Sequence, residues 1–292
     1  MTALRDIAEL VRAPAALSVP GDAVAGAAAT GALDRRTAGL SAAAVCLYWA
    51  GMAANDWADR DLDAKERPER PVPAGRVTAD TALGVAVGLS AAGLALAGLA
   101  GGPRALAVAV PLTGAVWAYD LKLKGTAAGP AAMAACRGLD VLLGASARPG
   151  RWRQAMAPAL TVAAHTYTVT ALSRREVTGG GRLLPAVTLA GTAGVAAAAS
   201  ARPTAAPGRW PRSPLVPRAL AGWYAAGYGA RQIRALATPD AGNTRAAVGA
   251  GITGLPALQG ALVARSARPR AAALVAACAP LGQLLAKWMS PT

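Results

Sequence analysis

The chain has 292 residues, of which 54% are hydrophobic and only 15% are charged, and its mean hydropathy is +0.35. A soluble domain usually carries about 25% charged residues, whereas the charges here gather in short clusters between long uncharged runs. The net charge of +15 does not indicate nucleic-acid binding, because the basic residues lie between apolar runs, where anionic lipid headgroups are the expected partners. The composition predicts an all-α, polytopic membrane bundle, since lipid-embedded backbone must satisfy its own polar groups and the alternation of barrel strands is absent.

A membrane-spanning helix needs about 20 mostly apolar residues. The apolar runs that we expect to span cover residues 14–33, 38–54, 77–101, 104–119, 127–146, 155–172, 183–201, 216–236, 246–264 and 270–288. The run 216–236 could instead lie flat at the membrane surface, so the expected count is nine or ten. We expect residues 1–292 to form one integral-membrane domain, without a cleavable signal peptide, in a bacterial-type cell membrane.

The loop charges favour, by a small margin, an orientation with the N-terminus in the cytoplasm. The loops after the second, fourth and sixth spans would then share the cytoplasmic face.

The loop after the second span begins with "AANDWADRDLDAKERPERPVPAGRV" at residues 53–77. Asn55, Asp59 and Asp63 are four residues apart and would share one face of a helix, with Asp56 adjacent and Asp61 pointing elsewhere. Carboxylates so close together repel each other unless a cation lies between them. Hard oxygen ligands of this kind suit Mg²⁺ shared with a diphosphate. A solvated acidic helix end is the alternative.

The basic run that follows the aspartates contains Lys65, Arg67 and Arg70, which can contact an anion. The whole stretch resembles the first motif of the UbiA superfamily of intramembrane prenyltransferases, usually written NDxxDxxxD and followed by an RP-rich loop. The resemblance implies a bundle that binds a polyprenyl diphosphate under a cytoplasmic cap. It also implies that Mg²⁺ is the cofactor and that Arg67 and Arg70 contact the diphosphate. The implied metal ligands are Asn55, Asp56, Asp59 and Asp63.

The fourth span ends with "WAYDLKLKGTAAGP". In the family, a Tyr followed by a Lys contacts the diphosphate here, so the resemblance implies that Tyr119 and Lys122 act with Asp56 and Asp59 in catalysis and that Lys124 assists. Ordinary anchoring of Tyr and Lys at the membrane surface is the alternative.

The sixth span ends with "TYTVTALSRREVTGGGR". The family usually has a second acidic motif, DxxxD, at this place. Here Glu176 stands where the first acid belongs and Gly180 where the second belongs, so Arg174 and Glu176 are the expected diphosphate-site residues. This form of the second motif, together with the stretch "CRGLDVLLGA", resembles the sequences of an EboC-like bacterial branch of the family.

Polar residues also occur inside predicted spans. Arg137 and Asp140 are three residues apart and could pair with each other or contact substrate, and Asp22 should face the cavity. His165, the only histidine, is more typical of a hydrogen-bonded packing residue than of a catalytic base.

The sequence therefore predicts a Mg²⁺-dependent prenyltransferase that acts on a polyprenyl diphosphate and a small or lipid-soluble acceptor. A terpene cyclase of the same fold, a cation transporter and a non-catalytic protein that binds lipid diphosphate are the alternatives. Membrane lipids are expected around the bundle, and the sequence indicates no nucleic acid or protein partner.

Overall fold

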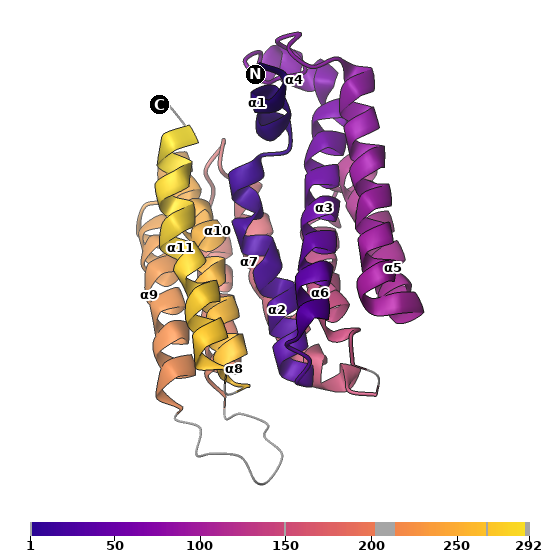
Figure 1. Cartoon of the computed structure of the whole chain (residues 1–292). Helices are drawn as coiled ribbons and strands as arrows, with labels where there is room; N and C mark the ends of the chain where they lie inside the picture. The colour runs from indigo at the N-terminus through magenta and orange to yellow at the C-terminus, as the bar shows by residue number, and fades with distance from the viewer. Residues whose placement is uncertain (1, 149, 202–213, 267, 290–292) are drawn as a thin grey trace.

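The computed structural model describes residues 2–148, 150–201, 214–266 and 268–289, with side chains between Leu4 and Leu281. Within these ranges the chain forms helices and connecting loops and no strand, which confirms the all-α prediction (Figure 1). Several of the expected apolar runs become single helices with bounds that differ by a few residues. These are α6 (Gly129–Ala145), α7 (Trp152–Ser173), α8 (Leu183–Ser200), α9 (Leu215–Ala237), α10 (Ala241–Ala264) and α11 (Pro269–Met289).

The N-terminal part is more divided than the sequence predicts. A short helix, α1 (Thr2–Leu10), precedes a 3₁₀ segment, η1 (Ala13–Ser18), and then α2 (Val19–Thr30). Pro14 and Pro20 stand in the first turns of η1 and α2. Proline lacks a backbone N–H and is tolerated in a first turn, where no intrahelical partner is lost.

The second expected span is a longer helix, α3 (Arg35–Ala58). Its first turn is closed by a capping box, in which the Asp34 carboxylate accepts from the Arg36 N–H at 2.8 Å and the Thr37 hydroxyl accepts from the Asp34 N–H at 3.3 Å. A short helix, α4 (Arg60–Glu66), follows directly and carries the second half of the acidic cluster.

The third and fourth expected spans form a tight hairpin within α5 (Ala79–Ala118). Gly102 adopts φ 68° and ψ −157°, a conformation that only glycine reaches without strain. Because of this turn the two arms run side by side, and Trp117 Nε1 donates to Ser90 Oγ at 3.0 Å across 27 residues. A π-helical segment, η2 (Tyr119–Leu123), ends the second arm.

Helices α2 and α6 approach so closely that their backbones touch. A Cβ atom added to Gly26 would lie 1.8 Å from the Val141 carbonyl oxygen, and one added to Gly144 would lie 1.9 Å from the Ala23 carbonyl oxygen. Small residues allow this kind of contact between membrane helices. The pair forms the centre of the bundle, with α3 and α5 on one side and α8 to α11 on the other (Figure 1).

The helix α9, for which the sequence left a surface position open, is packed against α8 and α10. Tyr224 and Tyr228 on α9 are fully buried. Within the described ranges, four helical stretches are by length and composition apolar enough to cross a membrane: residues 35–58, 79–123, 183–200 and 241–264.

Candidate functional site

The acidic cluster lies at the end of the bundle where α1 and α4 meet the end of α3 (Figure 1). We call this end the cap, and we include in it η2, the residues that follow η2, and the loop between α7 and α8. The cap is polar, whereas the helices below it are lined mainly by Ala, Val and Leu. A charged group at the cap therefore stands at the entrance of an apolar bundle.

One pair of cap oxygens shares a lysine. Lys124 Nζ lies 2.7 Å from Asp59 Oδ1 and 3.0 Å from Asn55 Oδ1. The Lys124 and Asp59 side chains are 25% and 22% exposed, so their ion pair is largely shielded from water. This contact joins η2 to the end of α3 across 69 residues.

The other pair consists of two carboxylates, Asp56 and Asp63, which share an arginine. Arg70 Nη1 lies 2.5 Å from Asp63 Oδ2 and 3.4 Å from Asp56 Oδ1. Arg12 Nη2 reaches the same Asp56 oxygen at 2.8 Å, and Arg67 lies 4.0 Å from Asp63. Asp56 and Asp63 are each 3% exposed, so their charges depend on these cations for stabilisation.

The sequence predicted one helical face carrying Asn55, Asp59 and Asp63, and this prediction is wrong in detail. Asp59 has φ −91° and ψ 4°, so α3 stops at Ala58 and α4 begins a new helix. The oxygens are instead divided into two pairs, Asn55 with Asp59 and Asp56 with Asp63. The side chain of Asp61 is 92% exposed, which confirms that it points away from the cluster.

The chemistry of these donors suits Mg²⁺. All four are hard oxygen ligands, and the two members of each pair converge on a single cationic nitrogen, from Lys124 or from Arg70. Within the described part of the chain, no three acidic, His or Cys side chains gather closely enough to hold a metal alone. Mg²⁺ is usually bound through one or two carboxylates together with substrate phosphates. The donors therefore fit a Mg²⁺ ion shared with a diphosphate.

The loop after the fourth span separates its two lysines. Lys124 enters the cluster, whereas Lys122 is exposed and no contact joins it to the described acidic residues. Tyr119 is half-buried at the start of η2. Asp120, beside it, is buried, and a Cβ atom on Gly51 would lie 3.2 Å from its carboxylate. Asp120 therefore packs against α3 one turn before Asn55.

The loop between α7 and α8 closes another side of the cap. Arg174 donates through Nη1 to the carbonyl of Thr126, which follows η2. Burial raises the pKa of the Glu176 carboxyl, while Arg245 and Arg67 oppose this effect. Because Arg67 belongs to the acidic loop, its influence on Glu176 places the two loops close together.

The N-terminal helix is fixed to the cap by a cluster of ion pairs that we call the clasp, formed by Arg76, Asp6 and Glu9. Arg76 lies 2.6 Å from Asp6 and 2.8 Å from Glu9, and it also donates to the carbonyl of Glu69 at 2.9 Å. The hydrogen bond to Arg76 lowers the pKa of Glu9, and the same contact raises the pKa of Arg76. The clasp holds α1 against the loop that carries Arg70.

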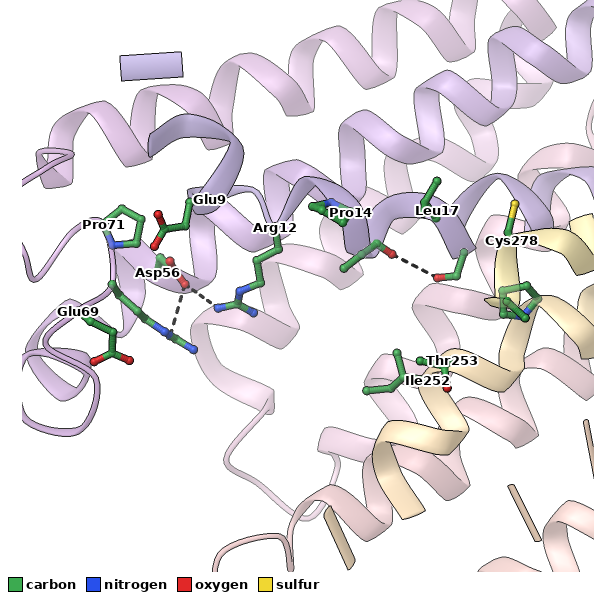
Figure 2. Close-up of a pocket in the computed structure, with 15 residues that line it drawn as sticks. Glu9, Arg12, Pro14, Leu17, Asp56, Glu69, Pro71, Ile252, Thr253 and Cys278 are labelled. Carbon is green, nitrogen blue, oxygen red and sulfur yellow. Dashed lines mark hydrogen bonds and ion pairs between the residues drawn. The ribbon is translucent and has the colours of Figure 1, made fainter. Parts of the chain in front are cut away.

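A cavity of about 540 Å³ leads from the cap into the bundle. Figure 2 shows Glu9, Arg12 and Asp56 at its polar end, and Ile252 and Cys278 at its apolar end. The wall between them is formed by η1, α10 and α11. A cavity of this size, mostly apolar with a few polar groups at one end, is typical of a ligand site. This distribution of polar and apolar groups suits a lipid with a charged head.

Comparison with known proteins identifies the family. The UbiA prenyltransferase family model matches residues 17–235. The chain belongs to the UbiA prenyltransferase family. The EboC-like branch remains a prediction.

The UbiA assignment agrees with individual relatives. Over 123 residues, or 42% of this chain, it is 40% identical to a digeranylgeranylglyceryl phosphate synthase of Ignicoccus hospitalis. Over 95 residues, or 32% of this chain, it is 39% identical to a protein of the same name from Methanothrix thermoacetophila. These matches span 40% and 35% of the relatives' own lengths.

A solved UbiA homolog from Aeropyrum pernix K1 is 17% identical to this chain. The two superpose with a TM-score of 0.65 over 85% of this chain and 96% of that one, which shows the same fold.

A polar network lies inside this UbiA bundle, close to the cavity wall. Arg137 Nε lies 2.9 Å from Asp22 Oδ2, and Gln259 Nε2 donates to Asp22 Oδ1 at 2.6 Å. Arg137 and Gln259 also donate to the carbonyl of Ser18, a cavity residue. Asp140 Oδ1 is buried and has no hydrogen-bond partner among the described residues. Arg137 therefore pairs with Asp22 on another helix, and the pairing with Asp140 that its spacing suggested is not formed among the described residues.

His165 behaves as a packing residue. It is 1% exposed, its Nδ1 lies 2.8 Å from the Tyr224 hydroxyl, and its ring meets Tyr224 and Tyr228 edge-on. These contacts join α7 to α9 and give His165 Nδ1 and the Tyr224 hydroxyl a hydrogen-bond partner.

Two cap residues, Arg12 and Asp120, were not predicted from the sequence. Arg12 lies between two short helices, 44 residues from Asp56, and its sequence context "ELVRAP" only marks it as a charge before an apolar run. Asp120 stands directly after Tyr119, so its position beside a predicted site residue was the available signal.

Proposed function

We propose that this protein is a Mg²⁺-dependent intramembrane prenyltransferase. It would move a prenyl group from a polyprenyl diphosphate to a lipid-soluble acceptor, and the cap would face the cytoplasm. The observation that carries the proposal is the meeting of paired oxygen ligands, cations and an apolar cavity at one end of a UbiA bundle.

In this proposal the diphosphate binds at the cap and the prenyl chain extends into the cavity. Asn55, Asp56, Asp59 and Asp63 would hold Mg²⁺, which supplies a positive charge to the diphosphate oxygens when bound. Lys124 and Arg70, already in the cluster, would shift from carboxylate to phosphate oxygens, which accept charge-assisted hydrogen bonds well.

The remaining predicted residues take outer positions. Arg67 on the acidic loop acts electrostatically on Glu176 of the loop after α7, and Arg174 holds that second loop to the residues after η2. Tyr119 borders the site from η2. The side chain of Lys122 is exposed and would have to turn inward to reach a phosphate.

The cap residues would accelerate cleavage of the bond between the prenyl carbon and the diphosphate oxygen. Negative charge grows on the leaving oxygen as that bond breaks, and fixed cations aimed at this oxygen stabilise the transition state more than the ground state. The Ala- and Leu-rich walls below the cap would keep water from the prenyl cation. The acceptor then forms the new bond and loses a proton.

The relatives suggest the first substrates to test. Because the curated relatives are named digeranylgeranylglyceryl phosphate synthase, we would begin with geranylgeranyl diphosphate as donor and geranylgeranylglyceryl phosphate as acceptor. Geranyl and farnesyl diphosphates test the chain length.

The decisive experiment measures diphosphate release by the purified protein in lipid nanodiscs, with and without Mg²⁺. Asp56→Ala and Asp59→Ala should abolish release, while Asp61→Ala, from the same run but 92% exposed, should not. Release that persists without Mg²⁺, or in both site variants, would overturn the proposal. A labelled product formed without any acceptor would instead indicate a terpene cyclase.

A further inference from the structure

Arg12 occupies an unusual place in the backbone. Its φ of 48° and ψ of 51° make it the one non-glycine residue with positive φ in the described part of the chain. A side-chain-bearing residue rarely adopts this left-handed conformation, and it persists only where the surroundings hold it. The backbone of Arg12 therefore needs support from neighbouring contacts.

The clasp supplies that support at the polar end of the cavity. Arg76 ties Asp6 and Glu9 of α1 to the carbonyl of Glu69, directly before Arg70. Arg12 follows the end of α1 by two residues. Because the clasp holds α1 in place, it also fixes the position of the Arg12 backbone.

The Arg12 guanidinium points into the polar end of the cavity (Figure 2). Its Nη2 lies 2.8 Å from Asp56 Oδ1, and its Nη1 lies 3.4 Å from the Met52 sulfur. The side chain is 37% exposed, so it retains room to move. Arg70 reaches the same Asp56 oxygen at 3.4 Å, so two guanidinium groups compete for one carboxylate atom.

We propose that Arg12 is a movable counter-ion of the diphosphate site. With the site empty it neutralises Asp56, and with substrate present it releases Asp56 to Mg²⁺ and binds the diphosphate oxygens. This inference rests on the proposed function. The loop after α7 carries one acid, Glu176, and Gly180 stands where the second acid of the DxxxD motif would be. Arg12 then brings the positive charge that a second metal ion would otherwise supply.

This role predicts two binding changes of opposite sign. In Arg12→Gln, Asp56 loses a competing cation, so Mn²⁺ alone, followed by EPR as a substitute for Mg²⁺, should bind several-fold more tightly. Geranylgeranyl thiolodiphosphate, which resists cleavage, should bind about tenfold to a hundredfold more weakly, because a charged hydrogen-bond donor to phosphate is lost.

Three further variants separate this role from a loss of structure. Arg5→Gln removes a positive charge from the exposed face of α1 and should change neither affinity. Arg12→Lys keeps the charge without the forked geometry and should lie between Arg12→Gln and the unmodified protein. Arg76→Gln breaks the clasp at a residue that does not line the cavity and should shift both affinities in the same directions as Arg12→Gln, but less.

The outcomes distinguish the two proposals. The counter-ion role is wrong if Arg12→Gln lowers the affinity for both Mn²⁺ and the thiolodiphosphate. It is also wrong if neither Arg12→Gln nor Arg12→Lys changes either affinity. Both conclusions hold even where the unmodified protein turns over substrate. If the unmodified protein shows no Mg²⁺-dependent release, the proposed function fails, whereas the opposite shifts in binding would still support Arg12 as a diphosphate ligand.

Discussion

The two lysines after the fourth span offer the sharpest test of the site. Lys124 and Lys122 are two residues apart, but only Lys124 enters the cluster, where it lies 2.7 Å from Asp59 and 3.0 Å from Asn55. We expect Lys124→Met, which keeps the length of the side chain and removes its charge, to lower kcat/KM for the prenyl diphosphate. Lys122→Met, on an exposed side chain, should leave kcat/KM within about twofold, as substitutions at exposed positions usually do.

The size of the effect follows from the contacts. A hydrogen bond to a charged group contributes about 1.5–3 kcal/mol. Because Lys124 is 25% exposed, water screens part of this energy, and we expect about 1.5–2 kcal/mol. At about 1.4 kcal/mol per factor of ten, the expected loss is about 10-fold to 30-fold. The assay is Mg²⁺-dependent diphosphate release in nanodiscs across a range of donor concentrations. Equal losses in the two variants, or a larger loss in Lys122→Met, would refute the placement of Lys124.

Three other predictions concern packing, pH and the interior histidine. Gly144→Ala should lower Tm, because its Cβ would lie 1.9 Å from a carbonyl oxygen, while Gly194→Ala, with open space around it, should not. The clasp should loosen in acid: the pKa of Glu9 is lowered below 4.5, so its stabilisation is present at neutral pH and lost as pH falls through that lowered value. Limited proteolysis of α1 between pH 3 and 7 would detect this, and Glu9→Gln should remove the dependence. Tyr224→Phe should reduce Tm slightly and leave turnover unchanged, since the bond to His165 serves packing; a large loss of turnover would assign His165 a catalytic role.

Much of the fold could be predicted because apolar runs and their interruptions are local signals. The separation of residues 77–101 from 104–119 anticipated the hairpin, and Gly102 makes that turn. The first span was less predictable, because two prolines divide it into η1 and α2. The break at Asp59 was also missed, since four-residue spacing alone does not show where a helix stops.

The partners of the acidic residues lie beyond local sequence signals. Asp56 meets Arg12 across 44 residues and Asn55 meets Lys124 across 69 residues. Such pairs depend on how α1 and η2 pack against α3, which periodicity does not encode. Motif spacing therefore predicted that these oxygen-bearing side chains gather at one place, but not which cations neutralise them.

The arrangement of charges gives a physical reason for placing a dense acidic cluster at the end of an apolar helix. Asp56 and Asp63 are almost fully buried, and burying carboxylates without partners is strongly unfavourable. Arg12 and Arg70 stabilise them in the empty protein, as Lys124 stabilises Asp59. Under the proposed function the same three cations would bind the diphosphate. Under that function, substrate and metal would enter together by exchanging partners, so that neither the carboxylates nor the arginines would be left without a counter-charge. A cap built from exchangeable ion pairs can in this way remain folded when empty and still bind a highly charged head above an apolar cavity.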